Sequence, residues 1–248
     1  MISVSAGLLG SLVGVGGGII VVPALTLLLG VDIRHAIAAS IISVIATSSG
    51  AASSYVRAHI TNMRLAMVLE IATAAGALSG AYLAAYFSGQ WLFLLFGLVL
   101  SYTSFSMLRK KNEAAAQLPP DPLADRLKLH GSYFDKALGR EVVYRVSRTK
   151  LGLAVSYLAG VVSGLLGIGG GVLKVPVMNL SMGIPIKVCT ATSNFMIGVT
   201  AATGAAVYFM RGEVQPFVAA PVAVGVLLGA KIGAKLLSRL QGKTIRYV

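Results

Sequence analysis

The stretch GLLGSLVGVGGGIIVVPALTLLLGV, residues 7–31, decides how this chain is built, because a near copy, GVVSGLLGIGGGVLKVPVMNLSMGI, occupies residues 160–184. The two stretches align at a constant offset of 153 residues without a gap. The match extends to residues 83 and 236 and contains 22 identities in 77 positions. Self-similarity of this kind identifies an internal duplication. The chain therefore consists of two copies of one unit.

The composition is that of a protein embedded in lipid. Apolar residues make up 56% of the 248 positions, charged residues only 12%, and the mean hydropathy is +0.82. A soluble domain carries about 25% charged residues, so too few polar side chains remain here to cover a surface in water. Apolar runs of about 20 residues, long enough to cross a bilayer as helices, recur along the chain. We predict an all-α polytopic protein of the cell membrane (cytoplasmic or inner).

The polarity pattern divides the chain into three segments. Residues 1–108 form a first membrane repeat, residues 109–150 a cytoplasmic linker, and residues 151–248 a second membrane repeat. The first repeat ends in an apolar run at 90–108, whose counterpart should begin near Lys243. We therefore expect that a final helix is missing from this sequence. The linker mixes both charge signs with three prolines and is expected to be solvated.

The basic residues indicate topology and not nucleic-acid binding. The net charge is +13, and ten of the 21 Lys and Arg lie between Arg109 and Lys150, with most others at the ends of apolar runs. Such clusters are typical of cytoplasmic loops, whereas a nucleic-acid site needs a basic stripe on one face. We expect the protein to lie in a lipid bilayer and to bind no nucleic acid.

The direction of the second repeat depends on how the glycine-interrupted stretch crosses the membrane. If it is one span, the copies run parallel, and Lys235, Arg239 and Lys243 lie outside the cell. If the chain folds back at the glycines, each copy crosses an odd number of times and the copies are inverted. Inversion places most basic residues on the cytoplasmic side. Charge thus favours two inverted repeats, each opening with a glycine-broken helical hairpin, as in many secondary transporters.

Each copy carries a signal for a helix break near the middle of the membrane. Glycine clusters permit positive φ, and the proline that follows removes a backbone donor. Irregular backbone at this depth survives only where it is buried in protein or lines a polar cavity. Free N–H groups at two such breaks, meeting at a pseudo-two-fold axis, can bind an anion. The residues expected to form this site are Gly16, Gly17, Gly18, Pro23, Gly169, Gly170, Gly171 and Pro176.

Glycine also allows helices in a membrane to pack closely, and this is the alternative use of the clusters. We assign close packing to the glycines spaced by four in the third apolar run of each copy. These are Gly76, Gly80, Gly229 and Gly233.

A buried cation sharpens the expectation of an anion site. Lys174 stands in GVLKVP, where the first copy has Val21. A cation at membrane depth normally faces a cavity or a partner. The charge of Lys174 can be satisfied in three ways: by an anionic ligand, by snorkelling to the membrane interface, or by an ion pair with Glu70. The sequence does not decide among them.

Small polar residues follow each break. Ser40 and Ser193 hold the same repeat position, and Asn194 comes next in the second copy. Hydroxyl and amide groups can donate to an oxyanion without adding charge, although they also bond to helix carbonyls and across helix interfaces. We predict that these three side chains contact the substrate.

Motifs for catalysis are missing from the sequence. It has no nucleophile elbow, paired carboxylates, HExxH or phosphate-binding lysine–serine pair, and GVGGG lacks a following GK[ST]. The single cysteine, Cys189, and three scattered histidines offer neither a disulfide nor a metal site. We expect a protein that is not an enzyme and that has no cofactor.

The two glycine–proline stretches, with the segments AIAASIISV and CTATSNFMI that follow them, resemble the sulfite exporter TauE/SafE family, also called the TSUP family of membrane permeases. The resemblance covers nearly the whole chain except 112–148. It implies export or uptake of sulfite, sulfonates or related organic anions without ATP, and it is compatible with proton coupling. The family's Thr-Ser pair is kept as Thr192 and Ser193, but the first copy reads Ala39 and Ser40. The resemblance adds Thr192 to the expected binding residues.

The leading hypothesis is a secondary transporter, an exporter, of a small sulfur-containing anion bound between the two breaks. An anion channel and a non-transporting membrane scaffold subunit are the alternatives. A second copy of the chain, in a homodimer, is a further candidate partner. The sequence does not identify the anion, the direction or the coupling ion.

Overall fold

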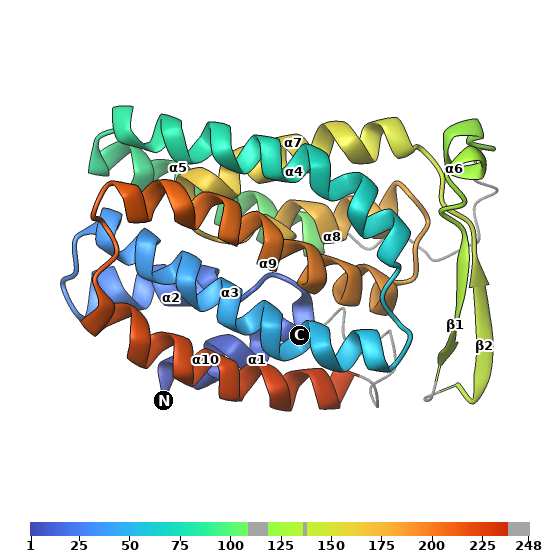
Figure 1. The fold of residues 1–248 in the computed structure, drawn as a ribbon, viewed down its shortest axis with the longest axis horizontal. Helices are drawn as coiled ribbons and strands as arrows, with labels where there is room; N and C mark the ends of the chain where they lie inside the picture. Colours follow the sequence, from blue (N-terminus) through green and yellow to red (C-terminus); the bar gives the residue numbers. More distant parts are fainter. Residues whose placement is uncertain (109–118, 136–137, 238–248) are drawn as a thin grey trace.

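The computed structural model describes residues 1–108, 119–135 and 138–237, which are mostly helical (Figure 1). The first repeat consists of α1 (Ile2–Val13), α2 (Gly18–Pro23), the π-helical turn η1 (Ala24–Leu28), α3 (Ile33–Arg57), α4 (Met63–Leu83), the 3-10 turn η2 (Ala84–Tyr86) and α5 (Gly89–Leu108). The linker contains α6 (Pro122–Arg126), β1 (Gly131–Asp135) and β2 (Arg140–Tyr144). The second repeat consists of α7 (Thr149–Leu166), α8 (Gly171–Leu180), α9 (Ile186–Met210) and α10 (Pro216–Leu237). Linker residues 109–118 and the helix expected near Lys243 lie outside the described residues.

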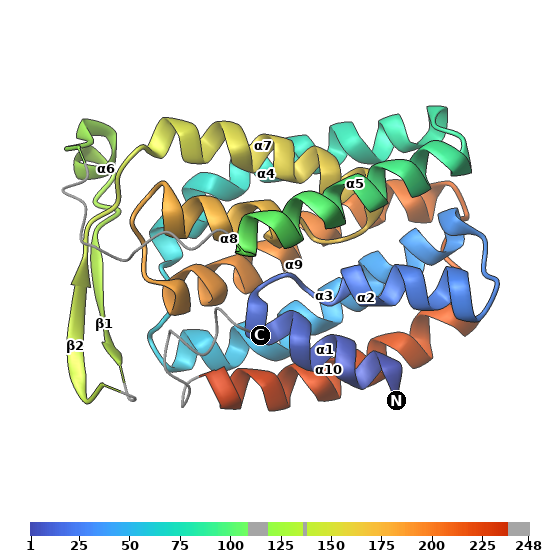
Figure 2. The ribbon, with the colours of Figure 1, turned by 180° about the vertical axis from the view of Figure 1, so that it is seen from behind.

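The predicted helical membrane architecture is confirmed. Within the described ranges, five helices are long and apolar enough to cross a membrane: α3, α4 extended through η2, α7, α9 and α10. Shorter apolar helices occupy the glycine-interrupted stretches. The chain folds back at both glycine clusters, so that α1 and α2, and likewise α7 and α8, form hairpins (Figure 1 and Figure 2).

Helices of each repeat pack mainly against helices of the other repeat. Helix α1 packs on α10, while its repeat equivalent α7 packs on α4, and α3 meets α9 at the centre. A Cβ atom at Gly76 would clash with the carbonyl oxygen of Tyr157, and one at Gly229 would clash with that of Val4, which is the equivalent contact at the 153-residue offset. The close-packing role predicted for these glycines is confirmed.

Chain direction differs between equivalent helices. In both views α3 and α9 run in opposite directions, as do α4 and α10 (Figure 1 and Figure 2). The helices alone do not define which end faces the cytoplasm. Inversion relative to a membrane therefore stays a prediction.

Most described residues of the linker are exposed, but a minority of them are buried against the helices. Strands β1 and β2 form an antiparallel hairpin with Gly131 opposite Tyr144. Leu129, Tyr133 and Tyr144 are buried in one apolar cluster with Leu65 of the first repeat and Met182 of the second. The described linker residues 119–135 and 138–148, which we call the cap, therefore cover one end of the helix bundle (Figure 1). Proline and charge content concealed this because the apolar residues are few and separated.

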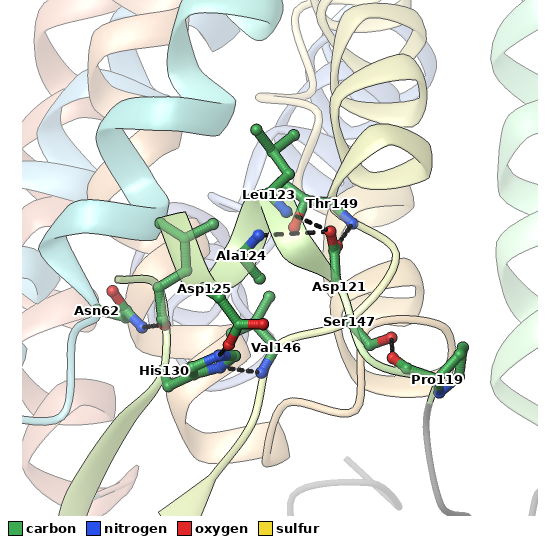
Figure 3. A network of polar contacts seen from close by, with 11 residues as sticks. Asn62, Pro119, Asp121, Leu123, Ala124, Asp125, His130, Val146, Ser147 and Thr149 are labelled. Atoms are coloured by element: carbon green, nitrogen blue, oxygen red, sulfur yellow. Dashed lines mark hydrogen bonds and ion pairs between the residues drawn. The ribbon is translucent and has the colours of Figure 1, made fainter. Parts of the chain in front are cut away.

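Hydrogen bonds hold the base of the cap to the bundle (Figure 3). Asp121 Oδ1 accepts from the backbone N–H groups at the start of α6, and its Oδ2 accepts from the N–H of Thr149 at 2.6 Å. Partial burial opposes ionisation of Asp121, but these donors outweigh it and lower its pKa. Nδ2 of Asn62 donates to the carbonyl oxygen of Leu129 at 2.8 Å and to the hydroxyl of Tyr144. The cap is thus bonded to both repeats.

A buried ion pair fixes the cap to α9. Lys187 Nζ lies 2.6 Å from Asp135 Oδ1, with side-chain exposures of 2% and 4%. The Tyr133 hydroxyl donates to Asp135 Oδ2. Burial, and secondly the Asp135 carboxylate, raise the pKa of Tyr133, so this hydroxyl keeps its proton.

We expect Lys187→Met to destabilise the protein by about 3–5 kcal/mol, because it removes the ammonium group that lies 2.6 Å from the buried Asp135 carboxylate. The double variant Lys187→Met/Asp135→Asn should recover most of that loss. Thermal unfolding in detergent measures both effects. Equal destabilisation by the single and double variants would show that the pair itself is not what holds the cap.

Candidate functional site

The glycine clusters form matched backbone breaks because equivalent residues adopt the left-handed conformation. Positive φ values of 82°, 86° and 76° occur at Gly14, Gly16 and Gly17. Their equivalents at the 153-residue offset, Gly167, Gly169 and Gly170, have φ values of 68°, 78° and 69°. A side chain at any of these positions would be strained. The predicted helix breaks are therefore present in both copies.

The structure brings the two breaks into direct contact. A Cβ atom at Gly171 would clash with the Gly14 carbonyl oxygen, and one at Gly18 would lie 2.6 Å from the Gly167 carbonyl oxygen. Cβ atoms at Gly16 and Gly169 would meet apolar side chains of the central helices. These glycines thus line one crossing point between the hairpins, which are closed onto each other in this conformation. The other two expected glycines, Gly17 and Gly170, pack on the first helix of their own hairpins.

Ser40 and Ser193, which hold the same repeat position, form hydrogen bonds across this crossing point. Ser40 Oγ donates to the Gly167 carbonyl oxygen at 2.8 Å, and Ser193 Oγ donates to the Gly14 carbonyl oxygen at 2.7 Å. Each hydroxyl satisfies a carbonyl that the opposite break leaves without a helical donor. In this conformation both protons are engaged with protein and not with a free site.

The prolines and the remaining expected residues have structural partners as well. Pro23 ends α2 before the π-helical turn η1, and Pro176 lies inside α8. Thr192 Oγ1 accepts from the backbone N–H of Asn62 at 3.1 Å. Asn194 Nδ2 donates to the carbonyl oxygens of Ser11 and Thr190, while its Oδ1 is buried without a hydrogen-bond partner among the described residues.

Lys174 differs from all of these residues. Only 1% of it is exposed, so it does not snorkel to an interface. Its Nζ has no hydrogen-bond partner among the described residues. It interacts electrostatically with Glu70, but the two are too far apart for an ion pair. The cation is therefore buried and without a direct counter-charge.

Comparison of the two copies shows that three buried polar residues near the breaks of the second copy have no polar equivalent in the first. Lys174, Thr190 and Asn194 each carry a buried polar atom without a partner among the described residues. The equivalent first-copy residues are aliphatic: Val21, Ile37 and Ile41. The Cβ position of Gly14 lies close to Thr190 and to Val175, the neighbour of Lys174. Thr190 and Asn194 of the second copy therefore lie beside the end of α1 and the first break, and Lys174 follows Gly171, which touches Gly14.

Thr190 and Glu70 were not among the residues predicted for the site. Glu70 is buried on α4, with its Oε1 accepting from Thr200 Oγ1 at 2.7 Å and its Oε2 without a partner among the described residues. A position-by-position comparison of the two copies would have singled out Thr190 from the sequence. Glu70 was named from the sequence only as an alternative partner of Lys174, as an acid in the middle of an apolar run.

These features define a polytopic membrane protein with a polar interior at a double helix break. The model of the sulfite exporter TauE/SafE family matches residues 1–248, and the chain belongs to this family of membrane transporters. The resemblance identified from the glycine–proline stretches is confirmed. Membership points away from an enzyme and fits a multi-pass protein of the cell membrane.

Individual relatives agree with this assignment. The chain is 31% identical over 247 residues to "Probable membrane transporter protein YunE" of Bacillus subtilis (strain 168), covering 97% of this chain and 88% of the relative. It is 30% identical over 122 residues to "Sulfite exporter TauE/SafE family protein 5" of Arabidopsis thaliana, covering 49% and 24%. A "Probable membrane transporter protein" of Xylella fastidiosa (strain 9a5c) is 29% identical over 199 residues, covering 78% and 67%. No solved structure matches the chain.

Proposed function

We propose that this protein is a secondary transporter, acting as an exporter, of a small sulfur-containing anion such as sulfite or an organosulfonate. The observation that carries the proposal is Lys174, a fully buried cation whose Nζ has no hydrogen-bond partner among the described residues. Burying a charge in lipid without a partner is costly, and such residues mark substrate paths. The family name, and that of the Arabidopsis relative, supply the sulfur chemistry.

Two features favour an anion beside Lys174. Helix α8 begins at Gly171, directly after the break, so its first N–H groups have no helical acceptor and its positive dipole end lies at the break. Lys174 is on the first turn of the same helix. Backbone donors and an ammonium group together form a site for a small oxyanion.

Binding between the two breaks couples occupancy to movement. The breaks touch at Gly14 and Gly171, so an anion can enter between them only if the hairpins separate. Separation also releases the Ser193 hydroxyl from Gly14, and the Ser40 hydroxyl from Gly167, as donors for the anion. A site that exists only in the separated state selects that state when substrate binds. This is the behaviour required of a transporter with alternating access.

Flux in proteoliposomes tests the proposal. Wild-type protein should catalyse exchange of radiolabelled sulfite, and a screen of thiosulfate, sulfoacetate and taurine as competitors should identify the preferred anion. A pH gradient should drive accumulation against the sulfite gradient. Flux that only runs downhill would favour an anion channel. Complete lack of binding and flux for every anion, with a stable protein partner on pull-down, would favour a scaffold subunit.

A further inference from the structure

Glu70 is a buried acid that the anion site leaves unused. It lies on α4 with 8% exposure, and Thr200 of the opposite repeat donates to its Oε1. Its Oε2 is buried and has no hydrogen-bond partner among the described residues. A carboxylate oxygen in such surroundings is costly to keep charged, and binding a proton removes the charge. Glu70 therefore has one oxygen satisfied by protein and one available for a proton.

Lys174 is the charge that acts on this carboxyl group. The titratable groups on the elements packed against α4 are directed elsewhere. Lys187 pairs with Asp135, and Arg211 donates to the carbonyl oxygen of Tyr82. The Tyr208 hydroxyl donates to the carbonyl oxygen of Gly164, and the Cys189 thiol donates to that of Ile184. The others on these elements are exposed: Lys150, Tyr157 and Tyr86.

The opposite charges belong to different repeats and have no repeat equivalents. Lys174 corresponds to Val21 and Glu70 to Ala223. In the empty state the ammonium and carboxylate sum to zero. An anion alone leaves one net negative charge, a proton alone leaves one net positive charge, and both together restore zero. Because an uncompensated buried ion costs several kcal/mol, only the empty and doubly loaded states can reorient across the membrane.

We propose that Glu70 binds the proton that travels with the anion, so that one proton and one monovalent anion cross together. This inference rests on the transport function proposed above. A proton gradient that is acidic outside the cell would drive such a symporter inward, so export by it must be driven by an outward gradient of the anion. The proton comes from water on the loading side, resides on Glu70 Oε2, and leaves on the other side when the anion leaves Lys174. No covalent bond to the anion is formed or broken.

Glu70→Gln tests the assignment, because glutamine keeps an acceptor for Thr200 and mimics the protonated acid. With membrane potential clamped, wild type should accumulate the monovalent form of radiolabelled sulfite, hydrogensulfite, about tenfold per unit of pH gradient. The variant should lose this accumulation but keep sulfite–sulfite exchange, since its loaded state is neutral and its empty state is charged. Glu213→Gln, which neutralises an acid outside the helices, should behave as wild type.

Each other outcome has a definite meaning. Wild type without sulfite exchange would refute the transport function and this inference with it. Accumulation by both wild type and Glu70→Gln would refute the proton-carrying role of Glu70 but not the transport function. Loss of sulfite–sulfite exchange in a folded Glu70→Gln protein would refute the same role. Carbodiimide labelling of wild-type protein needs no variant: adduct at Glu70, found by mass spectrometry and decreasing as pH rises, is expected. No adduct at Glu70 at any pH would overturn the assignment.

Discussion

Lys174→Met should lower sulfite flux in proteoliposomes by about 100-fold or more. Losing a charged donor in a buried site costs about 3 kcal/mol, and each 1.4 kcal/mol is a factor of ten. Methionine matches the length of the aliphatic stem, so the volume at this buried position changes little. The loss should appear in exchange as well as in pH-driven accumulation, because the anion itself has lost its counter-charge.

Exposed Lys231 on α10 provides the matched control. Lys231→Met removes the same charge from the chain and should leave flux near the wild-type level. Thermal unfolding of both variants separates transport from folding. Flux by a folded Lys174→Met protein at the wild-type rate would show that the anion does not depend on this cation.

Gly171→Ala should destabilise the protein by about 3 kcal/mol, the upper end of the range for overpacking. The new Cβ would clash with the Gly14 carbonyl oxygen and lie 2.9 Å from Ser193 Oγ, both of which belong to the crossing of the two hairpins. Backbone cannot yield as a flexible side chain can, so the hairpins must move apart. The transition in thermal unfolding should fall, and anion flux should fall with it.

Gly204→Ala on α9 is the control, because its Cβ would meet nothing within 4 Å. Alanine is favoured over glycine in a helix by up to about 1 kcal/mol, so this variant should be as stable as wild type or slightly more stable. If Gly171→Ala unfolds at the same temperature as Gly204→Ala, the two breaks are not packed against each other as described.

The scaffold could be predicted from sequence because the duplication repeats every structural signal. Glycine clusters at a fixed offset located both breaks, and glycines spaced by four located the close helix contacts. Apolar runs located the spanning helices. These features depend on local backbone preference and on lipid as solvent, and both can be read residue by residue.

Contacts between distant segments could not be predicted in the same way. The cap was expected to be solvated, yet Asp135 pairs with Lys187, 52 residues later. Ser40 and Ser193 were chosen as anion ligands, and in this conformation they donate to carbonyls of the opposite breaks. Sequence gives the donor groups, but only the packing of the hairpins decides which acceptors they meet.

The most direct test of the anion site is a structure of the protein with selenite, whose selenium gives an anomalous signal in place of the sulfur of sulfite. The account predicts one peak at mid-membrane, within hydrogen-bonding distance of Lys174 Nζ and the start of α8, with the two breaks separated. A peak elsewhere, or closed breaks with Lys174 unoccupied at saturating selenite, would contradict it.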